Sequence, residues 1–210
     1  LQEGHLIPFA SRCEIAQGSL EDRGLELAWL SCPVDAFFMM VQGSGTLEYE
    51  DDTSQTFHYS ATNGHPYTSI GKELIRRHLL PEQGLTAMAL SEWLKSHPKE
   101  AEDIMNVNAS YVFFQLSQKT HTPHGAIGEP LIPWRSMAID PAFIPLGAPL
   151  WLNLESTPWE QRSYESLIFA QDVGGAIKGP IRGDLYGGSG PDAFTKAGAL
   201  HHHGALFVLL

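Results

Sequence analysis

The sequence predicts a mainly β fold with a few helices. Before residue 60 and after residue 135, short apolar runs alternate with residues typical of turns, which is the pattern of strands joined by tight connections. Residues 70–106 differ, because their apolar side chains recur at spacings of three and four, the period of an amphipathic helix. A length of 210 residues, 43% of them hydrophobic and 18% charged, suits a folded chain with one sizeable core or two smaller ones.

Four strands are expected in the N-terminal part. Each is an apolar or aromatic run bounded by turn residues, and the runs are 25–30, 36–41, 46–49 and 56–59. Glu50, Asp51 and Asp52 separate the last two runs. This short acidic segment predicts a hairpin turn between two antiparallel strands.

Helices are expected within residues 70–106. Apolar residues recur at helical spacing after Leu74 and again after Met88, and Thr86 is the expected N-cap of the second helix. Pro98, followed by several acidic residues, predicts the start of a third short helix, since early acids favour the helix dipole.

The rest of the chain has the pattern of strands separated by Gly and Pro. A strand is expected at 111–115, and a polar stretch rich in Thr, His, Pro and Gly at 119–130 is typical of a linker. Further strands are expected at 136–139, 150–154, 167–170 and 205–210.

Charge and cysteine content exclude several classes of protein. The formal charge of −11 argues against a nucleic-acid partner, because such binding rests on clustered Lys and Arg. Cys13 and Cys32 have no metal-ligand spacing, and the sequence leaves open whether they pair. No apolar run approaches the ~20 residues of a membrane helix. The chain begins with Leu1 rather than Met and without a signal region, so we expect a processed form or a fragment.

The densest chemical signal lies in residues 171–188. Asp172 stands before one glycine-rich turn and Asp184 before another, with Lys178 between them. Glycines let a backbone turn sharply and let a bulky ligand approach closely. Two acids beside such turns, at the ends of strands, predict a sugar site or acid–base chemistry.

The segments around these acids resemble a known family. The run from Asp172 to Gly179 followed by Asp184, together with residues 138–141 and 144–147, is similar to the three-aspartate domain of the membrane-bound lytic transglycosylase A family. The three acids are then Asp140, Asp172 and Asp184. Further upstream, four segments resemble the same family in the same order along the chain, namely 41–45, 63–67, 69–72 and 108–114.

The resemblance implies an architecture. It implies a double-psi β-barrel domain and a second β-rich domain, inserted into the barrel, that forms one wall of a substrate groove. Residues 1–118 are then the insert with its helices, and residues 119–210 are the C-terminal part of the barrel. The family also has an N-terminal barrel segment for which we find no counterpart in this chain, and a barrel without it has unpaired strand edges.

The resemblance also implies a reaction. The family cleaves the β-1,4 bond of peptidoglycan between N-acetylmuramic acid and N-acetylglucosamine and forms 1,6-anhydro-N-acetylmuramic acid. The sugar's own 6-hydroxyl attacks, so a single acid/base replaces the pair of carboxyl groups that a hydrolase needs. The motif places this acid/base at Asp184. We expect Ile181, Leu185 and Tyr186 to bury it and Asp172 to add negative charge, because both effects favour the protonated acid.

Substrate contacts are expected from Gln42, Ser44, Tyr67, Lys178 and Tyr186. Gln42 and Ser44 lie beside glycines, where they either meet hydroxyl and acetamido groups of a sugar or cap a tight turn. The two tyrosines either line sugar faces or belong to a core. Lys178 is either a substrate contact or the solvated tip of a hairpin.

Other polar residues have a structural interpretation. Asp140 precedes a proline, and we expect it to be a structural acid that binds turn amides. Asp172 either orients Asp184 or only ties down the amides of its own turn. The triplet 201–203 consists of three histidines, but consecutive residues cannot share one face of a strand, so we expect no metal and no cofactor.

The implied partner is the glycan strand of peptidoglycan. The resemblance places the protein in the bacterial periplasm, attached to the outer membrane by a lipid anchor that lies outside this chain; we expect a monomer, with a cell-wall synthesis or division complex as a further partner. Two other functions stay open. One is a non-catalytic barrel that binds cell-wall polysaccharide, and the other is a glycoside hydrolase that uses Asp172 and Asp184, with carboxyl oxygens about 5 to 9 Å apart.

Overall fold

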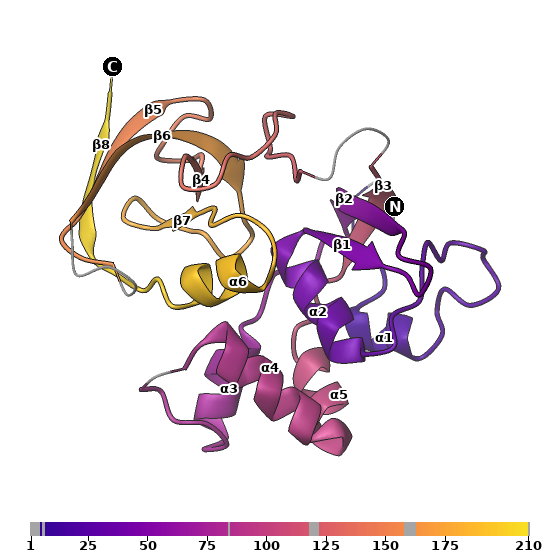
Figure 1. The fold of residues 1–210 in the computed structure, drawn as a ribbon. Coiled ribbons are helices and arrows are strands. Elements are labelled where there is room, and N and C mark those ends of the chain that lie inside the picture. Colours follow the sequence, from indigo (N-terminus) through magenta and orange to yellow (C-terminus); the bar gives the residue numbers. More distant parts are fainter. Residues whose placement is uncertain (1–4, 6, 84, 118–121, 158–162, 210) are drawn as a thin grey trace. The chain divides into compact units, whose positions relative to one another are not determined.

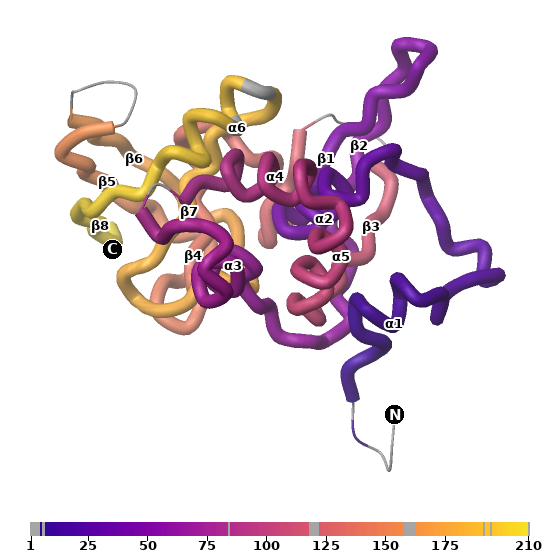
Figure 2. The backbone as a smooth tube through the Cα atoms, turned by 90° about the horizontal axis from the view of Figure 1, so that it is seen from below, coloured from indigo at the N-terminus to yellow at the C-terminus, as the bar shows by residue number. Residues whose placement is uncertain are grey.

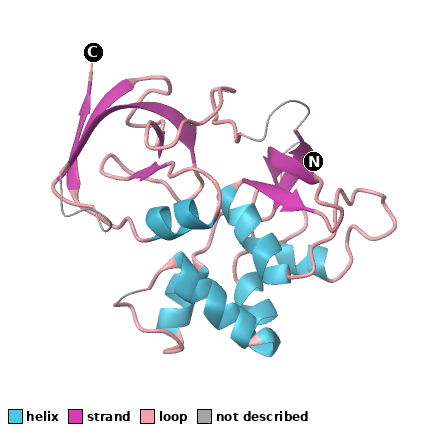
Figure 3. Cartoon of the chain, in the orientation of Figure 1, coloured by secondary structure: helices cyan, strands magenta, loops and turns pink. Residues whose placement is uncertain are grey.

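The computed structural model describes residues 5, 7–83, 85–117, 122–157 and 163–209, and the chain divides into two compact units, Leu1–His121 and Thr122–Leu210 (Figure 1). The first unit combines helices with a small antiparallel sheet, and the second is built on one larger, curled sheet (Figure 3). Within the described ranges, no helix is long and apolar enough to cross a membrane. Cys13 and Cys32 are both free thiols, which answers the question that the sequence left open.

The helices of the first unit begin where the sequence supplies a cap or a proline. Pro33 and Pro98 each occupy the first turn of a helix, where the missing N–H costs nothing. Thr86 Oγ1 accepts the N–H of Ala89 at 3.1 Å and so confirms the expected N-cap. The three helices expected within 70–106 are also confirmed. In chain order the helices are α1 (Arg12–Ala16), α2 (Pro33–Gln42), α3 (Ile70–Arg76), α4 (Ala87–Ser96) and α5 (Pro98–Asn106).

One apolar core joins these helices. Helix α4 lies against α2 and α5, and α3 lies against α5 (Figure 2). Burying a Leu, Ile or Phe side chain contributes about 1.5–3 kcal/mol, so the shared core fixes the helices to one another. Its buried residues are Val34, Phe37, Ile70, Leu74, Leu94, Ala101, Ile104 and Met105.

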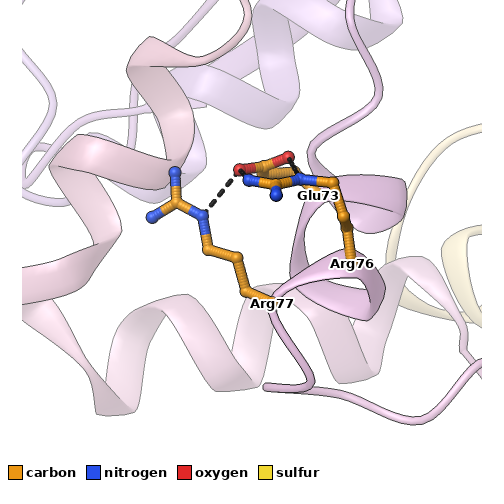
Figure 4. A network of polar contacts seen from close by, with 3 residues as sticks. All are labelled: Glu73, Arg76 and Arg77. Carbon is orange, nitrogen blue, oxygen red and sulfur yellow. Dashed lines mark hydrogen bonds and ion pairs between the residues drawn. The ribbon is translucent and has the colours of Figure 1, made fainter.

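A network of three charged side chains stabilises the end of α3 (Figure 4). The carboxylate of Glu73 accepts two hydrogen bonds from Arg76, both of 2.7 Å, and one from Arg77 Nε at 2.6 Å. These donors lower the pKa of Glu73 to about 2. Both arginines lie one helical turn after Glu73, the order that favours an acid–base pair on a helix.

The first unit also holds a three-stranded antiparallel sheet in the order β1-β2-β3. Its strands are β1 (Ser44–Glu48), β2 (Ser54–Thr62) and β3 (Val112–Leu116). The turn between β1 and β2 closes with a hydrogen bond from Tyr49 N–H to the Thr53 carbonyl at 2.9 Å, and Asp52 has φ 62°. The hairpin expected around residues 50–52 is therefore confirmed.

The strand expected at residues 36–41 is wrong, because these residues belong to helix α2. An unbroken apolar run has no period of its own, so it fits a buried strand or a buried helix equally well. Pro33 starts the helix, and Gly43, in the left-handed conformation at φ 78°, ends it. Val34 and Phe37 are buried at a spacing of three, on one face of the helix.

The strand expected at residues 25–30 is also wrong. Leu25, Leu27 and Trp29 alternate as in a strand, yet all three are exposed, Trp29 by 82%. No strand in the described part of the chain pairs with this run, and without a neighbour its backbone cannot form a ladder. The sequence missed α1, α6 (Pro191–Gly198) and β7 (Gly183–Leu185), which span only 5, 8 and 3 residues and are too short for a period to emerge.

The curled sheet of the second unit has the strand order β7-β4-β6-β5-β8 (Figure 1). Strands β4 and β6 are parallel, and the other neighbours are antiparallel. The elements are β4 (Ser136–Ile139), β5 (Pro149–Leu154), β6 (Tyr164–Val173), β7 (Gly183–Leu185), α6 (Pro191–Gly198) and β8 (Gly204–Val208). The strands expected at 136–139, 150–154 and 167–170 are confirmed, and β8 covers the described part of 205–210 except Leu209.

One face of this sheet forms the core of the second unit. Along β6, Ser166, Ile168 and Ala170 are buried while the residues between them are exposed, which is the alternation of a strand with one buried face. The buried cluster comprises Met137, Ile139, Ile144, Leu150, Leu152, Leu154, Ile168 and Ala170. The first part of the expected linker, 119–121, lies outside the described residues. Its remaining part, 122–130, has an isolated β-bridge between His124 and Pro130 and no helix or strand.

Candidate active site

Two acids lie on either side of Ala138. In the register of the sheet, Ala138 of β4 is the partner of Asp172 on β6 and also of Asp184 on β7. Paired residues on neighbouring strands share a face of the sheet. The preceding residue, Met137, pairs with Ala170 and Leu185 on the core side. Asp172 and Asp184 are therefore brought together on the face opposite the core.

A β-bulge puts Asp172 on this face. Met137 pairs with Ala170, but the next residue of β4 pairs with Asp172, so Gln171 is the extra residue in β6. With an unbroken period of two, Asp172 would follow Ile168 and Ala170 into the core. The inserted residue reverses the side on which the following side chain lies.

The two acids are separated by one strand. Neighbouring strands lie ~4.8 Å apart, so the backbones at Asp172 and Asp184 are roughly 10 Å apart. Each carboxylate has its own partners, and in the described part of the chain no hydrogen bond joins the two. The space over Ala138, the smallest side chain of the three, lies between them.

Asp172 is the more enclosed of the two acids. Its Oδ1 accepts the backbone N–H of Ala126 at 3.1 Å. Burial raises the pKa of Asp172, and the N–H groups of Val173 and Ala126 oppose this rise. Gly125 lets the Ala126 segment come this close, because a Cβ at Gly125 would lie 2.2 Å from the Gln171 carbonyl oxygen.

Asp184 lies in an environment different from the one expected. Its side chain is 48% exposed and forms a two-pronged ion pair with Arg182, Nε to Oδ1 at 2.7 Å and Nη2 to Oδ2 at 3.2 Å. The expected burial by Ile181 and Leu185 is wrong, because Ile181 is 99% exposed and Leu185 points to the core on the opposite face. Tyr186 directs its hydroxyl to Ser189 Oγ at 3.1 Å.

Asp140 holds the loop that joins the two acid-bearing strands. It lies at the end of β4, 7% exposed, and its Oδ2 accepts the N–H of Gly179 at 2.9 Å while its Oδ1 accepts that of Ala142 at 3.2 Å. These N–H groups lower the pKa of Asp140, and the charge of the exposed Lys178 adds to the effect. These contacts are those of a carboxylate that binds turn amides, as expected from the sequence.

The sequence missed Gln171 and Ser136 as members of this face. Ser136 Oγ donates to Gln171 Oε1 and accepts the N–H of Ile132 at 2.8 Å. Ser136 is completely buried. The available signals were Gln171, directly before Asp172, and Ser136, the one polar residue of a strand that Asp140 follows.

The expected sugar contacts of the first unit lie near the start of its sheet and in one loop. Gln42 is the exposed last residue of α2, and Ser44 is the first residue of β1, with Gly43 turning the chain between them. Tyr67 is half-buried in the loop before α3, and burial raises the pKa of its hydroxyl. The turn at Gly43 and the loop that carries Tyr67 both belong to the first unit.

A buried arginine that the sequence did not reveal organises this region. Arg12 is 7% exposed and donates to the carbonyls of Asn108, at 3.0 Å, and Ser110, at 2.7 Å. Its guanidinium lies over the rings of Phe37 and Tyr111, 4.6 and 5.3 Å from their centres. Burial lowers the pKa of Arg12 to about 10, and the side chain ties α1 and α2 to the segment before β3.

The histidine triplet lies in a loop of the second unit. His201, His202 and His203 are exposed between α6 and β8. Among the side chains that the structure describes, no group of three or more His, Cys, Asp or Glu residues is placed to hold a metal ion.

Comparison with known families matches both units. Residues 1–115 match the MltA specific insert domain, and residues 135–210 match the 3D domain. Two curated relatives, both named membrane-bound lytic murein transglycosylase A, come from Vibrio cholerae and Escherichia coli K12. The chain is 36% identical to the first over 206 residues and 38% identical to the second over 205, which covers 95% of this chain and 55% of each relative.

Solved structures are similar over nearly the whole chain. A membrane-bound lytic murein transglycosylase from Agrobacterium tumefaciens superposes with a TM-score of 0.91 at 33% identity, covering 99% of this chain and 58% of that one. E. coli MltA with bound chitohexaose gives 0.87 at 35% identity, covering 95% and 61%. The chain thus spans about half the length of these relatives. The fold class expected from the sequence is confirmed, and the chain belongs to the membrane-bound lytic murein transglycosylase A family.

Proposed function

We propose that the chain takes part in lytic transglycosylation of peptidoglycan. The observation that carries the proposal is the pair of acids on one face of the three-aspartate domain, with Ala138 between them. The names of the relatives support it, since the two curated ones are murein transglycosylases. A sheet face bearing two carboxyl groups beside glycine-rich turns is suited to a sugar.

In the proposed reaction Asp184 acts twice. Its protonated carboxyl group gives its proton to the glycosidic oxygen as the bond from C1 of N-acetylmuramic acid breaks, leaving an oxocarbenium-like centre. The 6-hydroxyl of the same sugar then attacks C1, and its proton passes to the Asp184 carboxylate. The products are a 1,6-anhydro sugar and a free 4-hydroxyl, and Asp184 regains its starting form without water.

Asp172 is proposed to assist Asp184. Its side chain lies on the same face, one strand further, and its enclosure makes it the better-held of the two carboxyl groups. A negative charge here favours the proton on Asp184, and a neutral Asp172 offers a hydrogen-bond donor to the sugar. Asp140 is proposed to act only through the loop it holds.

Substrate contacts are proposed from both units. We propose that Gln42, Ser44 and Tyr67 face Asp184 across a groove, with residues 1–118 as one wall and residues 119–210 as the C-terminal part of a double-psi barrel. Lys178 and Tyr186 are exposed or half-exposed near the acids in sequence and are proposed to contact the glycan. Ligand sites favour such positions between domains.

The proposed substrate, the peptidoglycan glycan strand, implies a periplasmic place of action. The relatives are named membrane-bound, and we propose attachment to the outer membrane through a lipid anchor, a monomeric state and contact with a cell-wall synthesis or division complex. Each of these is separate from the chemistry of the site.

A two-carboxylate glycoside hydrolase is the second candidate, and one observation favours it. Asp172 and Asp184 have unlike surroundings, one enclosed and one ion-paired, and enzymes use such differences to separate an acid from a nucleophile or base. A barrel that only binds polysaccharide is the third.

The products distinguish these functions. Purified sacculi would be incubated with the chain, and the soluble muropeptides would be examined by mass spectrometry. Transglycosylation predicts products lighter by one water than those of a hydrolase. A product of hydrolytic mass would replace the proposal with the second candidate, and sacculi bound but not cleaved would replace it with the third.

A further inference from the structure

Arg182 is the charged group in direct contact with the proposed acid. Arg182 lies directly before β7, two residues before Asp184. Its planar guanidinium donates to both carboxylate oxygens of Asp184, at 2.7 and 3.2 Å. The contact raises the pKa of Arg182. Both side chains are about half exposed, so the pair is open to substrate as well as to solvent.

The other charges around Asp184 do not make such a contact. In the described part of the chain, no side chain except Arg182 donates to its carboxylate. The neighbouring strand β4 places uncharged Ala138 opposite Asp184. It is followed by Asp140, whose oxygens accept backbone N–H groups. The charged groups carried by β6 are Glu165 and Asp172, the loop before β7 carries Lys178 besides Arg182, and α6 carries Asp192 and Lys196.

A bidentate arginine has two effects on a carboxylate. It stabilises the ionised form by charge, and it fixes the plane of the group because two parallel hydrogen bonds allow little rotation. A general acid needs the opposite charge state at the first step, with a proton on one oxygen. After the glycosidic bond breaks, the same carboxylate must accept the 6-hydroxyl proton, and there the arginine assists.

We propose that Arg182 is a positioning residue that holds the Asp184 carboxylate in one orientation and in its ionised form, and thereby sets the upper pH limit of turnover. The proposal rests on the proposed function of Asp184. One of the two contacts with Arg182 is given up when Asp184 takes its proton, and it forms again when the proton has left for the glycosidic oxygen. The pair therefore favours the second half of the reaction at the expense of the first.

The test compares Arg182→Gln with Arg182→Lys in the pH–rate profile of product release from sacculi. Removal of the guanidinium leaves the Asp184 carboxylate without its paired charge, so Arg182→Gln should move the basic limb of the profile upward. Arg182→Lys keeps the charge without the fork, so its basic limb should stay near that of the wild type while the rate falls. An unmoved basic limb in Arg182→Gln would overturn the proposal.

Arg76→Gln is the matched control, because Arg76 makes the same two-pronged contact with a carboxylate in the first unit. Its profile should match that of the wild type. A shift of equal size there would also overturn the proposal, since the effect would then be one of net charge.

A second readout is independent of turnover. The carboxyl carbon of Asp184, assigned by its loss in Asp184→Asn, would be titrated by carbon-13 NMR in the wild type and in Arg182→Gln. A midpoint at higher pH in the variant than in the wild type supports the proposal, and equal midpoints refute it. If the wild-type chain releases no anhydro product, the proposed function fails while this titration still decides whether Arg182 controls the protonation of Asp184.

Discussion

The three aspartates of the motif have different hydrogen-bond partners and different exposure to solvent. Asp140 accepts two backbone N–H groups, Asp172 is enclosed and accepts the N–H of Ala126, and Asp184 is paired with an arginine. The pKa of Asp140 is lowered and that of Asp172 is raised, in each case by the group's own surroundings. A motif of three aspartates therefore contains three environments, and only the contacts of each carboxylate distinguish their roles.

Replacement of Asp140 by Asn should destabilise the loop between β6 and β7. The amide group has one acceptor oxygen instead of two, so either Gly179 or Ala142 loses its partner. Because the pKa of Asp140 is lowered in the folded protein, its stabilising effect exists above the ordinary value of about 3.9 and is lost as the pH falls below it. Thermal unfolding should show Asp140→Asn less stable than the wild type at pH 7, with the two converging at low pH.

Asp103→Asn is the control for this series, because Asp103 is exposed on α5. Its unfolding temperature should follow that of the wild type at each pH. An Asp140→Asn variant as stable as the wild type at pH 7 would contradict the anchoring role.

At the scale of strands and loops, a β-bulge and a loop position the two acids, and neither can be predicted from the strand propensity of the local sequence. The bulge at Gln171 places Asp172 on the face opposite the core, and the loop that begins at Gly174 returns the chain so that β7 lies beside β4. The sequence predicted the hairpin at 50–52 and the N-cap at Thr86 because those signals are local. It did not predict the bulge, the three-residue β7 or the Arg182–Asp184 pair, because each depends on a neighbouring strand or on a side-chain rotamer.

The approach of Gly125 to β6 should not tolerate a side chain. A Cβ in Gly125→Ala would lie 2.2 Å from the backbone carbonyl oxygen of Gln171, so β6 or the segment must shift. Forced overpacking costs about 1–3 kcal/mol, and the N–H of Ala126 should move away from Asp172. Urea unfolding would measure the loss of stability.

Gly71→Ala, in helix α3, provides the comparison. Its new Cβ would meet a methyl group of the flexible Leu85 side chain at 3.1 Å. Alanine is favoured over glycine in a helix by about 1 kcal/mol, so this variant should not be less stable than the wild type by as much as Gly125→Ala. Equal losses in the two variants would mean that the Gly125 contact is not special.

Helix α3 should depend on pH through Glu73. The pKa of Glu73 is lowered from 4.5 to about 2 by Arg76 and Arg77, so its contribution to stability is present above about 4.5 and disappears as the pH falls toward 2. Glu73→Gln should therefore unfold at a lower temperature than the wild type at pH 7 and at nearly the same temperature near pH 2. A constant difference across this range would show that the ion pairs do not contribute.

At the scale of the whole molecule, Gln42 and Tyr67 are proposed to bind the same glycan as the distant Asp184. If Gln42 and Tyr67 bind the glycan equally in the ground state and the transition state, Gln42→Ala and Tyr67→Ala should raise KM by about tenfold with little change in kcat. Soluble glycan fragments allow both constants to be measured. A fall in kcat with constant KM would instead place these residues in transition-state stabilisation, and no change in either would remove them from the site.

Asp184, and not the more enclosed Asp172, is proposed to transfer the proton. The direct test is the initial rate of anhydro-muropeptide release from sacculi by the wild type, Asp184→Asn and Asp172→Asn, with folding checked by circular dichroism. We expect Asp184→Asn to lose about 10²–10⁴-fold in rate, the usual contribution of a general acid–base group, and Asp172→Asn to retain measurable turnover. Wild-type turnover by Asp184→Asn together with an inactive Asp172→Asn would contradict the claim and transfer the acid's role to Asp172.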